Sequence, residues 1–319
     1  MIKGHGDDAY QYPDIRMNFS SNIPQHVDLS ALKQHLATRL DLIANYPEPE
    51  ALSLERLIAS QHGISEECVI VTSGATEAIY LTAQTFRMSH HFAAPTFSEY
   101  EDAVRMYRSY AKKTQALWLC NPNNPTGEVL PWQTVYERMS HYDLVVIDQS
   151  YEGYTEVPLL TPREAAAAGN VVQIHSLTKT YGVPGLRIGY IVAARRLAQQ
   201  LRRQMRPWAV NALAIEAGLF LIAHATPIRP DLAEAQRLSA ALNAIDGISV
   251  LPTQTNFMLC TISGHTATQL KEHLVRQHGM LIRDASNFRG LTPHHFRVAA
   301  QLPIENDALV SAINHYLHT

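Results

Sequence analysis

Residues 171–193 read VVQIHSLTKTYGVPGLRIGYIVA and carry the strongest fold signal in the sequence. The apolar run 171–176 leads into a polar segment that contains Lys179. A second apolar run, 187–193, follows a turn with two glycines and a proline. Short apolar runs bounded by turn residues are typical of buried strands. The stretch therefore predicts two strands of a buried sheet, with Lys179 displayed where the first strand ends.

The same pattern of short apolar runs extends toward the N-terminus. Further short apolar runs occupy residues 68–72, 91–94, 116–120 and 143–148. Helical periodicity fills the intervals, and we expect helices at 76–86, 98–107, 131–140 and 195–205. Strands that alternate with helices predict a mostly parallel sheet covered by helices. The fold class indicated by this part of the chain is α/β.

The pattern changes near residue 231. From there we expect a helix, strands near 248–260, a helix near 266–278, strands at 280–283 and 295–300, and a final helix. This order is α+β and indicates a second, smaller unit. We therefore predict an N-terminal arm (1–30) that contributes to the active site, a large domain (31–230) and a small C-terminal domain (231–319).

Composition narrows the classes of partner. The net charge is −3, with 46% hydrophobic and 17% charged residues, so neither nucleic acid nor another polyanion is indicated. A small-molecule substrate is expected instead. Three cysteines lie far apart without a CxxC pair, and the sixteen histidines are scattered. We expect buried, reduced thiols and no metal site.

Membrane and export signals are also not expected. The first ten residues include Asp7 and Asp8 and lack an apolar segment typical of a secretory signal, so we expect a cytoplasmic location. The apolar stretch 207–228 contains Glu216 and His224. Because a central glutamate is costly in lipid, this stretch predicts a buried helix and no membrane span.

Polar residues follow several predicted strands at the edge where open α/β sheets bind ligands. VIVTSGATEAI (69–79) runs from a strand through a small-residue turn into a helix, which directs the amides of Ala75 and Thr76 toward an anion. Alone, this segment is equally compatible with an ordinary turn between a strand and a helix. LWLCNPNNPTG (117–127) displays Asn124 after the next such strand.

The two following strands carry the charged residues. VVIDQSY (145–151) ends a buried strand in Asp148, with Tyr151 three residues later. An aspartate is costly to bury there unless it meets a positive partner or hydrogen-bond donors. In residues 176–190, the hydroxyls of Ser176 and Thr178 flank Lys179, and Arg187 follows eight residues downstream. Two hydroxyls and a guanidinium can hold a phosphate through charge-assisted hydrogen bonds.

In this order the motifs resemble the fold-type I pyridoxal phosphate (PLP) enzymes, the aspartate aminotransferase superfamily, over nearly the whole chain. The resemblance implies an aspartate-aminotransferase-like fold and PLP as cofactor. It makes Lys179 the Schiff-base lysine and Asp148 the partner of the pyridinium nitrogen. The other residues that it implies around the cofactor are Asn124 and Tyr151 at the ring's 3′-oxygen, Phe97 of PTFSEY as the stacking aromatic, and Ala75, Thr76, Ser176, Thr178 and Arg187 around the phosphate.

The resemblance also implies an assembly. Tyr46, in NYPEPE (45–50), matches a tyrosine that reaches the cofactor phosphate of the other subunit. A homodimer with shared active sites is therefore expected.

Within the superfamily the chain resembles threonine-phosphate decarboxylases and, less closely, histidinol-phosphate aminotransferases. The stretches that favour the decarboxylases are NFSSNIP (18–24), residues 176–190, RRQMRPWAVNALA (202–214) and LIRDASNFRGLTPHHFRVA (281–299). Arg297 matches the arginine that holds the substrate carboxylate, and Arg283 one that contacts the substrate's own phosphate. Arg283 could equally be a surface charge at a strand end. Asn22 and His5, the latter in a Gly-His-Gly-Asp segment, are the other expected substrate contacts.

Some residues depart from the pattern of the superfamily. Only 23 residues lie between Phe97 and Asn121, Gln149 and Ser150 replace the usual Glu-Ala, and His175 stands where arginine is common. None of these departures concerns the expected cofactor residues, but they leave the identity of the substrate open, because loops around a site set specificity while the scaffold stays fixed.

The reaction stays open at this stage. Decarboxylation of a phosphorylated amino acid such as threonine phosphate, transamination of histidinol phosphate or another amino acid, and a catalytically silent PLP-binding protein are all compatible with the sequence. The choice depends on which Cα bond stands perpendicular to the cofactor ring, and that angle is not written in the sequence.

Overall fold

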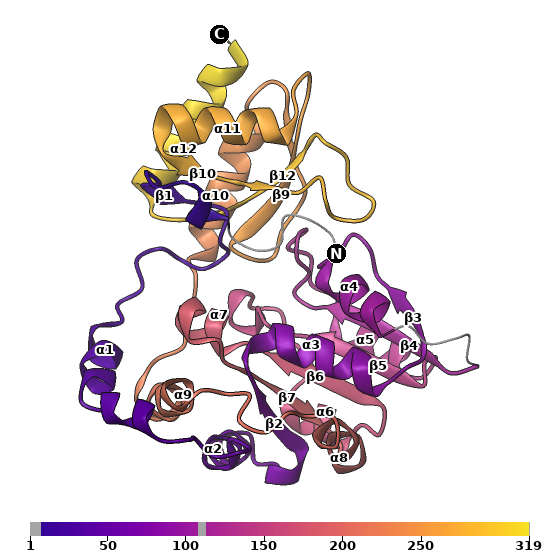
Figure 1. Ribbon diagram of the computed structural model, residues 1–319. Coiled ribbons are helices and arrows are strands. Elements are labelled where there is room, and N and C mark those ends of the chain that lie inside the picture. Colours follow the sequence, from indigo (N-terminus) through magenta and orange to yellow (C-terminus); the bar gives the residue numbers. More distant parts are fainter. Residues whose placement is uncertain (1–7, 108–112, 319) are drawn as a thin grey trace.

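The computed structural model describes residues 8–107 and 113–318, and the larger part of the chain is built on a six-stranded sheet in the order β2-β7-β6-β5-β4-β3 (Figure 1). The strands are β2 (Val69–Thr72), β3 (Ser89–Phe92), β4 (Gln115–Cys120), β5 (Leu144–Asp148), β6 (Val171–His175) and β7 (Gly189–Ala193). Pairs from β6 to β3 are parallel, whereas β7 is antiparallel to both neighbours. The predicted α/β class with a mostly parallel sheet is confirmed.

Helices cover both faces of this sheet because its side chains alternate between two apolar cores. In β5, Val145 and Ile147 join one core, whereas Leu144 and Val146 join the other. The first core contains buried residues of α2 (Leu52–His62), α5 (Trp132–Met139), α6 (Pro162–Ala167) and α9 (Ala212–His224), with α1 (Ser30–Ala37) beside α9. The second contains buried residues of α3 (Gly74–Thr85), α4 (Glu99–Met106) and α8 (Arg195–Arg202).

The C-terminal part forms a separate apolar core above the larger sheet in Figure 1. A four-stranded sheet runs in the order β11-β12-β9-β8. The elements of the C-terminal part are α10 (Leu232–Asn243), β8 (Ile248–Val250), β9 (Phe257–Ile262), α11 (Ala267–His278), β10 (Met280–Leu281), β11 (Arg283–Asp284), β12 (His295–Ala299) and α12 (Pro303–His318). The N-terminal strand β1 (Met17–Asn18) pairs with β10, so the arm lies on this part before the chain enters α1. The division into three domains stays a prediction.

Some element boundaries differ from the expected ones. β3 ends at Phe92, two residues early, because the amide of Ala94 donates to the carbonyl of Phe92 and turns the chain. The helix expected at 195–205 ends at Arg202, and the amides of Gln204 and Met205 bond to carbonyls three residues back. Helix ends commonly tighten in this way.

The expectation of buried, reduced cysteines is confirmed. Cys68, Cys120 and Cys260 are buried free thiols. Within the described ranges, no helix combines the length and apolar character needed to cross a membrane. The apolar stretch 207–228 contains α9, whose Glu216 pairs with His35 and Arg39.

A buried ion pair ties α2, α8 and β2 together. The Glu55 side chain is almost fully buried, and its carboxylate accepts a 2.7 Å hydrogen bond from Arg202 and a 3.0 Å bond from the amide of Val71. Burial raises the pKa of Glu55, and the Arg202 guanidinium opposes that rise. Removal of one partner from such a pair leaves an uncompensated buried charge.

Replacement of Arg202 by alanine should therefore lower the free energy of unfolding by about 3–5 kcal/mol at pH 7. Arg202 opposes the rise in the pKa of Glu55, so its removal should raise that pKa further, and the variant should gain more stability than the native protein when Glu55 takes up a proton. The deficit of Arg202→Ala should then shrink as the pH falls from 7 to 5.5, measured by urea denaturation. Arg195→Ala in the same helix, which breaks only an exposed pair with Glu67, should cost less than about 1 kcal/mol. A deficit that is independent of pH would contradict this account.

Candidate active site

A cavity of about 300 Å³ lies where the C-terminal ends of β4, β5 and β6 face the C-terminal part of the chain. Parallel strands end at the same edge of a sheet, so the residues that follow them meet there. The sequence-predicted site residues that line the cavity are Asn22, Ala75, Thr76, Phe97, Asn124, Asp148, Tyr151, Ser176, Thr178, Lys179, Arg187, Arg283 and Arg297.

Asp148 closes one side of this cavity with both carboxylate oxygens anchored. Its Oδ2 accepts a 2.8 Å hydrogen bond from the hydroxyl of Tyr100, and its Oδ1 accepts a 2.9 Å bond from the amide of Ser150. The carboxylate is 4% exposed, so these donors offset the cost of burying a charge. Tyr100 was not among the predicted residues. Its position three residues after Phe97, at the start of a helix, is a signal that could have indicated it.

The opposite side of the cavity fits a phosphate group. The first turn of α3 presents amides that have no partner within the helix. The Arg187 guanidinium packs against Gly74 so closely that a Cβ there would lie 2.6 Å from Nη2. The buried hydroxyl of Thr178 has no hydrogen-bond partner among residues 8–107 and 113–318. Amides, a guanidinium and an unsatisfied hydroxyl form the donor set that a phosphate requires.

Lys179 lines the same cavity from the short helix α7 (Leu177–Tyr181). Its backbone is fixed because its carbonyl accepts a 2.9 Å hydrogen bond from the hydroxyl of Tyr154. Its Nζ lies 5.6 Å from the ring centroid of Tyr151. The amine therefore shares the cavity with Asp148 and with the phosphate-fitting residues.

Two buried arginines enter the cavity from the C-terminal part. Arg283 of β11 and Arg297 of β12 are direct partners across an antiparallel pair, so their side chains leave the sheet on the same face. Arg297 donates to Asn124 Oδ1 and, at 2.5 Å, to the carbonyl of Ser20. Arg283 donates to Asn287 Oδ1 at 3.0 Å. Like charges directly opposite each other are destabilising, so this face favours anionic ligands.

Three other predicted residues are Asn22, Tyr46 and His5, of which Asn22 lines the described part of the cavity. Both polar atoms of the Asn22 side chain line the cavity without a hydrogen-bond partner in the described ranges. Tyr46 is 86% exposed beside Trp208, at 5.5 Å between ring centroids, and it does not line the cavity of its own chain. Its role at a neighbouring subunit stays a prediction. His5 lies outside the described residues.

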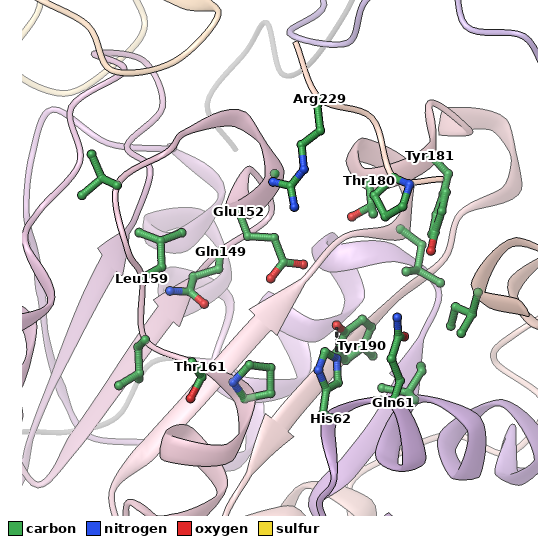
Figure 2. Close-up of a pocket in the computed structure, with 18 residues that line it drawn as sticks. Gln61, His62, Gln149, Glu152, Leu159, Thr161, Thr180, Tyr181, Tyr190 and Arg229 are labelled. Carbon is green, nitrogen blue, oxygen red and sulfur yellow. Dashed lines mark hydrogen bonds between the residues drawn. The ribbon is translucent and has the colours of Figure 1, made fainter. Parts of the chain in front are cut away.

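A second cavity of about 320 Å³ lies behind the same wall (Figure 2). Residues 148–153 and 176–181 are divided between the two spaces: Asp148 and Lys179 line the first, whereas Gln149, Glu152 and Thr180 line the second. Figure 2 shows Glu152 pointing into this space between Arg229 and His62.

Two of the departures from the superfamily pattern, Gln149 and His175, lie on that rear side. Gln149 lines the second cavity, and His175 Nδ1 lies 3.1 Å from Glu152 Oε1. Burial would raise the pKa of Glu152, but His175, His62 and Arg229 together lower it. These two residues therefore lie outside the lining of the first cavity, whereas Ser150, which also departs from the pattern, lines it and donates its amide to Asp148.

Comparisons with known proteins agree with this geometry. The model of the family described as aminotransferase class I and II matches residues 107–313. A putative threonine-phosphate decarboxylase of Caldanaerobacter subterraneus subsp. tengcongensis is 31% identical, with 97% of this chain and 92% of that protein covered. Histidinol-phosphate aminotransferase 2 of Pasteurella multocida is 27% identical, with coverage of 89% and 86%.

A solved structure is similar over almost the full length. The L-threonine-O-3-phosphate decarboxylase from Porphyromonas gingivalis is 36% identical with a TM-score of 0.91, and the match covers 95% of this chain and 100% of that one. The family match, the shared fold and a cavity that offers a lysine, a buried aspartate and a phosphate cradle all agree. The chain therefore belongs to the aminotransferase class I and II family and is a PLP-dependent enzyme.

Proposed function

We propose that the protein decarboxylates a phosphorylated α-amino acid, with L-threonine O-3-phosphate as the substrate. The arrangement of Arg283 and Arg297 carries this proposal, because two buried guanidinium groups on one face of a sheet favour a ligand with two anionic groups. Threonine phosphate offers a carboxylate and a phosphate. The names of the 31% and 36% identical relatives support the same substrate.

Transamination of histidinol phosphate is the second candidate. A relative at 27% identity carries that name, and its substrate is also a phosphate ester. Histidinol phosphate has no carboxylate, however, so it would bring one anionic group to the two arginines, whereas threonine phosphate would bring two. The charge of the cavity thus favours the amino-acid phosphate.

The chain's residues suit the cofactor as well. PLP, when bound, withdraws electrons from the substrate Cα. In the proposed arrangement the α3 amides, Ser176, Thr178 and Arg187 hold its phosphate, and Asp148 faces its ring nitrogen. Asn124 and Tyr151 donate to its 3′-oxygen, and Phe97 packs on its ring.

The remaining residues act on the substrate. Arg297 grips the carboxylate and Arg283 the phosphate, while Asn22, with its unsatisfied amide, offers a further polar contact. The Lys179 amine lies in the same cavity, where it can deliver a proton to Cα when the carboxylate leaves as CO₂. The same amine could instead move a proton away from Cα, which is the transamination outcome.

We also propose a homodimer in which Tyr46 serves the neighbouring subunit. The 86% exposure of this tyrosine beside Trp208 supports the idea, since both aromatic residues are then available to a partner. A cytoplasmic location belongs to the same proposal.

The first prediction concerns Lys179. Borohydride reduction of the PLP-loaded protein followed by peptide mapping should place the pyridoxyl label on this residue. Lys179→Ala should bind the cofactor without covalent attachment and lose at least about 1,000-fold in kcat, because no other amine lines the described part of the cavity. Lys33→Ala is a suitable control, since Lys33 is exposed in α1, outside the cavity. A label on a different lysine would refute the assignment.

The second prediction tests shared sites. Tyr46→Ala and Lys179→Ala proteins should each be inactive, whereas a mixture with random subunit exchange should recover about a quarter of the native activity. Half of the dimers are then mixed, and one of the two sites in each mixed dimer is intact. Exchange is verified with mass-tagged subunits. No recovery despite exchange would show that Tyr46 acts within its own chain.

The third prediction concerns the two arginines and the reaction together. Arg283→Ala should lower kcat/KM for O-phosphothreonine by about 2–4 kcal/mol, the scale for losing one partner of a desolvated charge pair, and should affect unphosphorylated amino acids far less. Arg297→Ala should impair both kinds of substrate. Release of CO₂ and production of keto acid are measured separately. We expect CO₂ release to dominate.

Arg289→Ala serves as the control for this experiment. Arg289 lies in the loop that follows β11, the strand of Arg283, but it is exposed and does not line the cavity. Equal losses for Arg283→Ala on phosphorylated and plain substrates would exclude a phosphate-binding role. Dominant keto-acid production would favour the aminotransferase.

A further inference from the structure

Tyr100 occupies a fixed position between two of the proposed cofactor contacts. It is the second residue of α4, and its side chain is fully buried. Its ring stacks on Trp118 at 5.3 Å between centroids and 26° between planes, and it meets the ring of Phe97 edge to face at 5.7 Å. Packing on two sides leaves the phenol one orientation.

That orientation directs the hydroxyl at Asp148. The 2.8 Å bond from Tyr100 fixes Oδ2, while the Ser150 amide fixes Oδ1 at 2.9 Å. A carboxylate held at both oxygens cannot rotate, yet each oxygen keeps a second lone-pair direction for another donor. Burial first, and then the charge of Asp148, raise the pKa of Tyr100 well above 10, so the hydroxyl remains a donor at every working pH.

Ring packing alone would not require this hydroxyl. Phenylalanine fills nearly the same volume, and a buried hydroxyl is costly unless it is bonded. Here the bond is made to the one carboxylate that lines the described part of the cavity.

We propose that Tyr100 is a positioning residue that holds the Asp148 carboxylate in the orientation in which it receives the N–H of the cofactor's pyridinium ring. The inference rests on the proposed role of Asp148. It assigns to Tyr100 an effect that depends on the ring nitrogen of the cofactor and not on the substrate.

The test is a titration of the apoprotein with PLP, followed by absorbance and fluorescence. Tyr100→Phe should raise the Kd for PLP about tenfold, equal to about 1.4 kcal/mol, near the lower end for a hydrogen bond to a charged group. Tyr80→Phe is the matched control. Its hydroxyl donates to the Glu99 carboxylate at 3.0 Å from helix α3, outside the cavity, and its loss should change the Kd less than about twofold.

A cofactor analogue identifies the atom involved. With 1-deazapyridoxal phosphate, in which CH replaces the ring nitrogen, Tyr100→Phe and the native protein should have the same Kd within about twofold. Equal losses for PLP and for the analogue would overturn the proposal, because they would indicate a general packing defect. An unchanged Kd for PLP would overturn it as well. Melting temperatures of the apoproteins report any loss of fold.

A double-mutant cycle separates Tyr100 from Asp148. In an Asp148→Asn background, Tyr100→Phe should change the Kd for PLP less than about twofold, because the two residues act as one unit. A further tenfold loss would show that Tyr100 acts independently and would overturn the inference. If Asp148→Asn alone leaves the Kd unchanged, the proposed role of Asp148 fails first. The two failures can be told apart. If only the role proposed for Tyr100 is wrong, Asp148→Asn weakens PLP binding and Tyr100→Phe does not.

Discussion

The buried carboxylate of Asp148 is the constraint around which this site is arranged. A charge at the end of a central strand is tolerated only with donors on both oxygens, and the chain supplies them from two directions. Ser150 belongs to the turn that follows β5, whereas Tyr100 belongs to α4, which packs on the same sheet. Because Tyr100 also contacts Phe97, the position of α4 fixes both a carboxylate and an aromatic ring at the cavity.

The wall behind this cavity explains why some departures from the superfamily pattern are tolerated. The segments after β5 and β6 contribute residues to both spaces, and the residues that line the first cavity, such as Asp148 and Lys179, differ from those that line the second, such as Glu152. His175 contacts Glu152, which points into the second cavity (Figure 2). Neither Gln149 nor His175 lines the first cavity, in keeping with a scaffold and a site that can vary separately.

Much of the fold and of the cavity lining could be predicted from the sequence. Buried strands that end in Asp148 and just before Ser176 converge by the geometry of parallel sheets, so their meeting was expected. The contact of Tyr100 with Asp148 depends on how α4 packs over the sheet, and local patterns do not encode that packing. The pairing of Arg283 with Arg297 depends on strand register, which the ten residues between β11 and β12 (285–294) leave undetermined. The exposure of Tyr46 becomes meaningful only when a second chain is considered.

The two parts of the chain contribute different groups to the cavity, and a bound substrate would contact both parts. The lysine and the phosphate cradle belong to the larger sheet, whereas both arginines belong to the C-terminal sheet. Arg297 already bridges the parts by donating to Asn124 of the larger part and to Ser20 of the N-terminal arm. A substrate with two anions would add further bridges through Arg283. Binding energy from a remote phosphate can then orient the reacting Cα, which is how contacts far from the chemistry raise kcat.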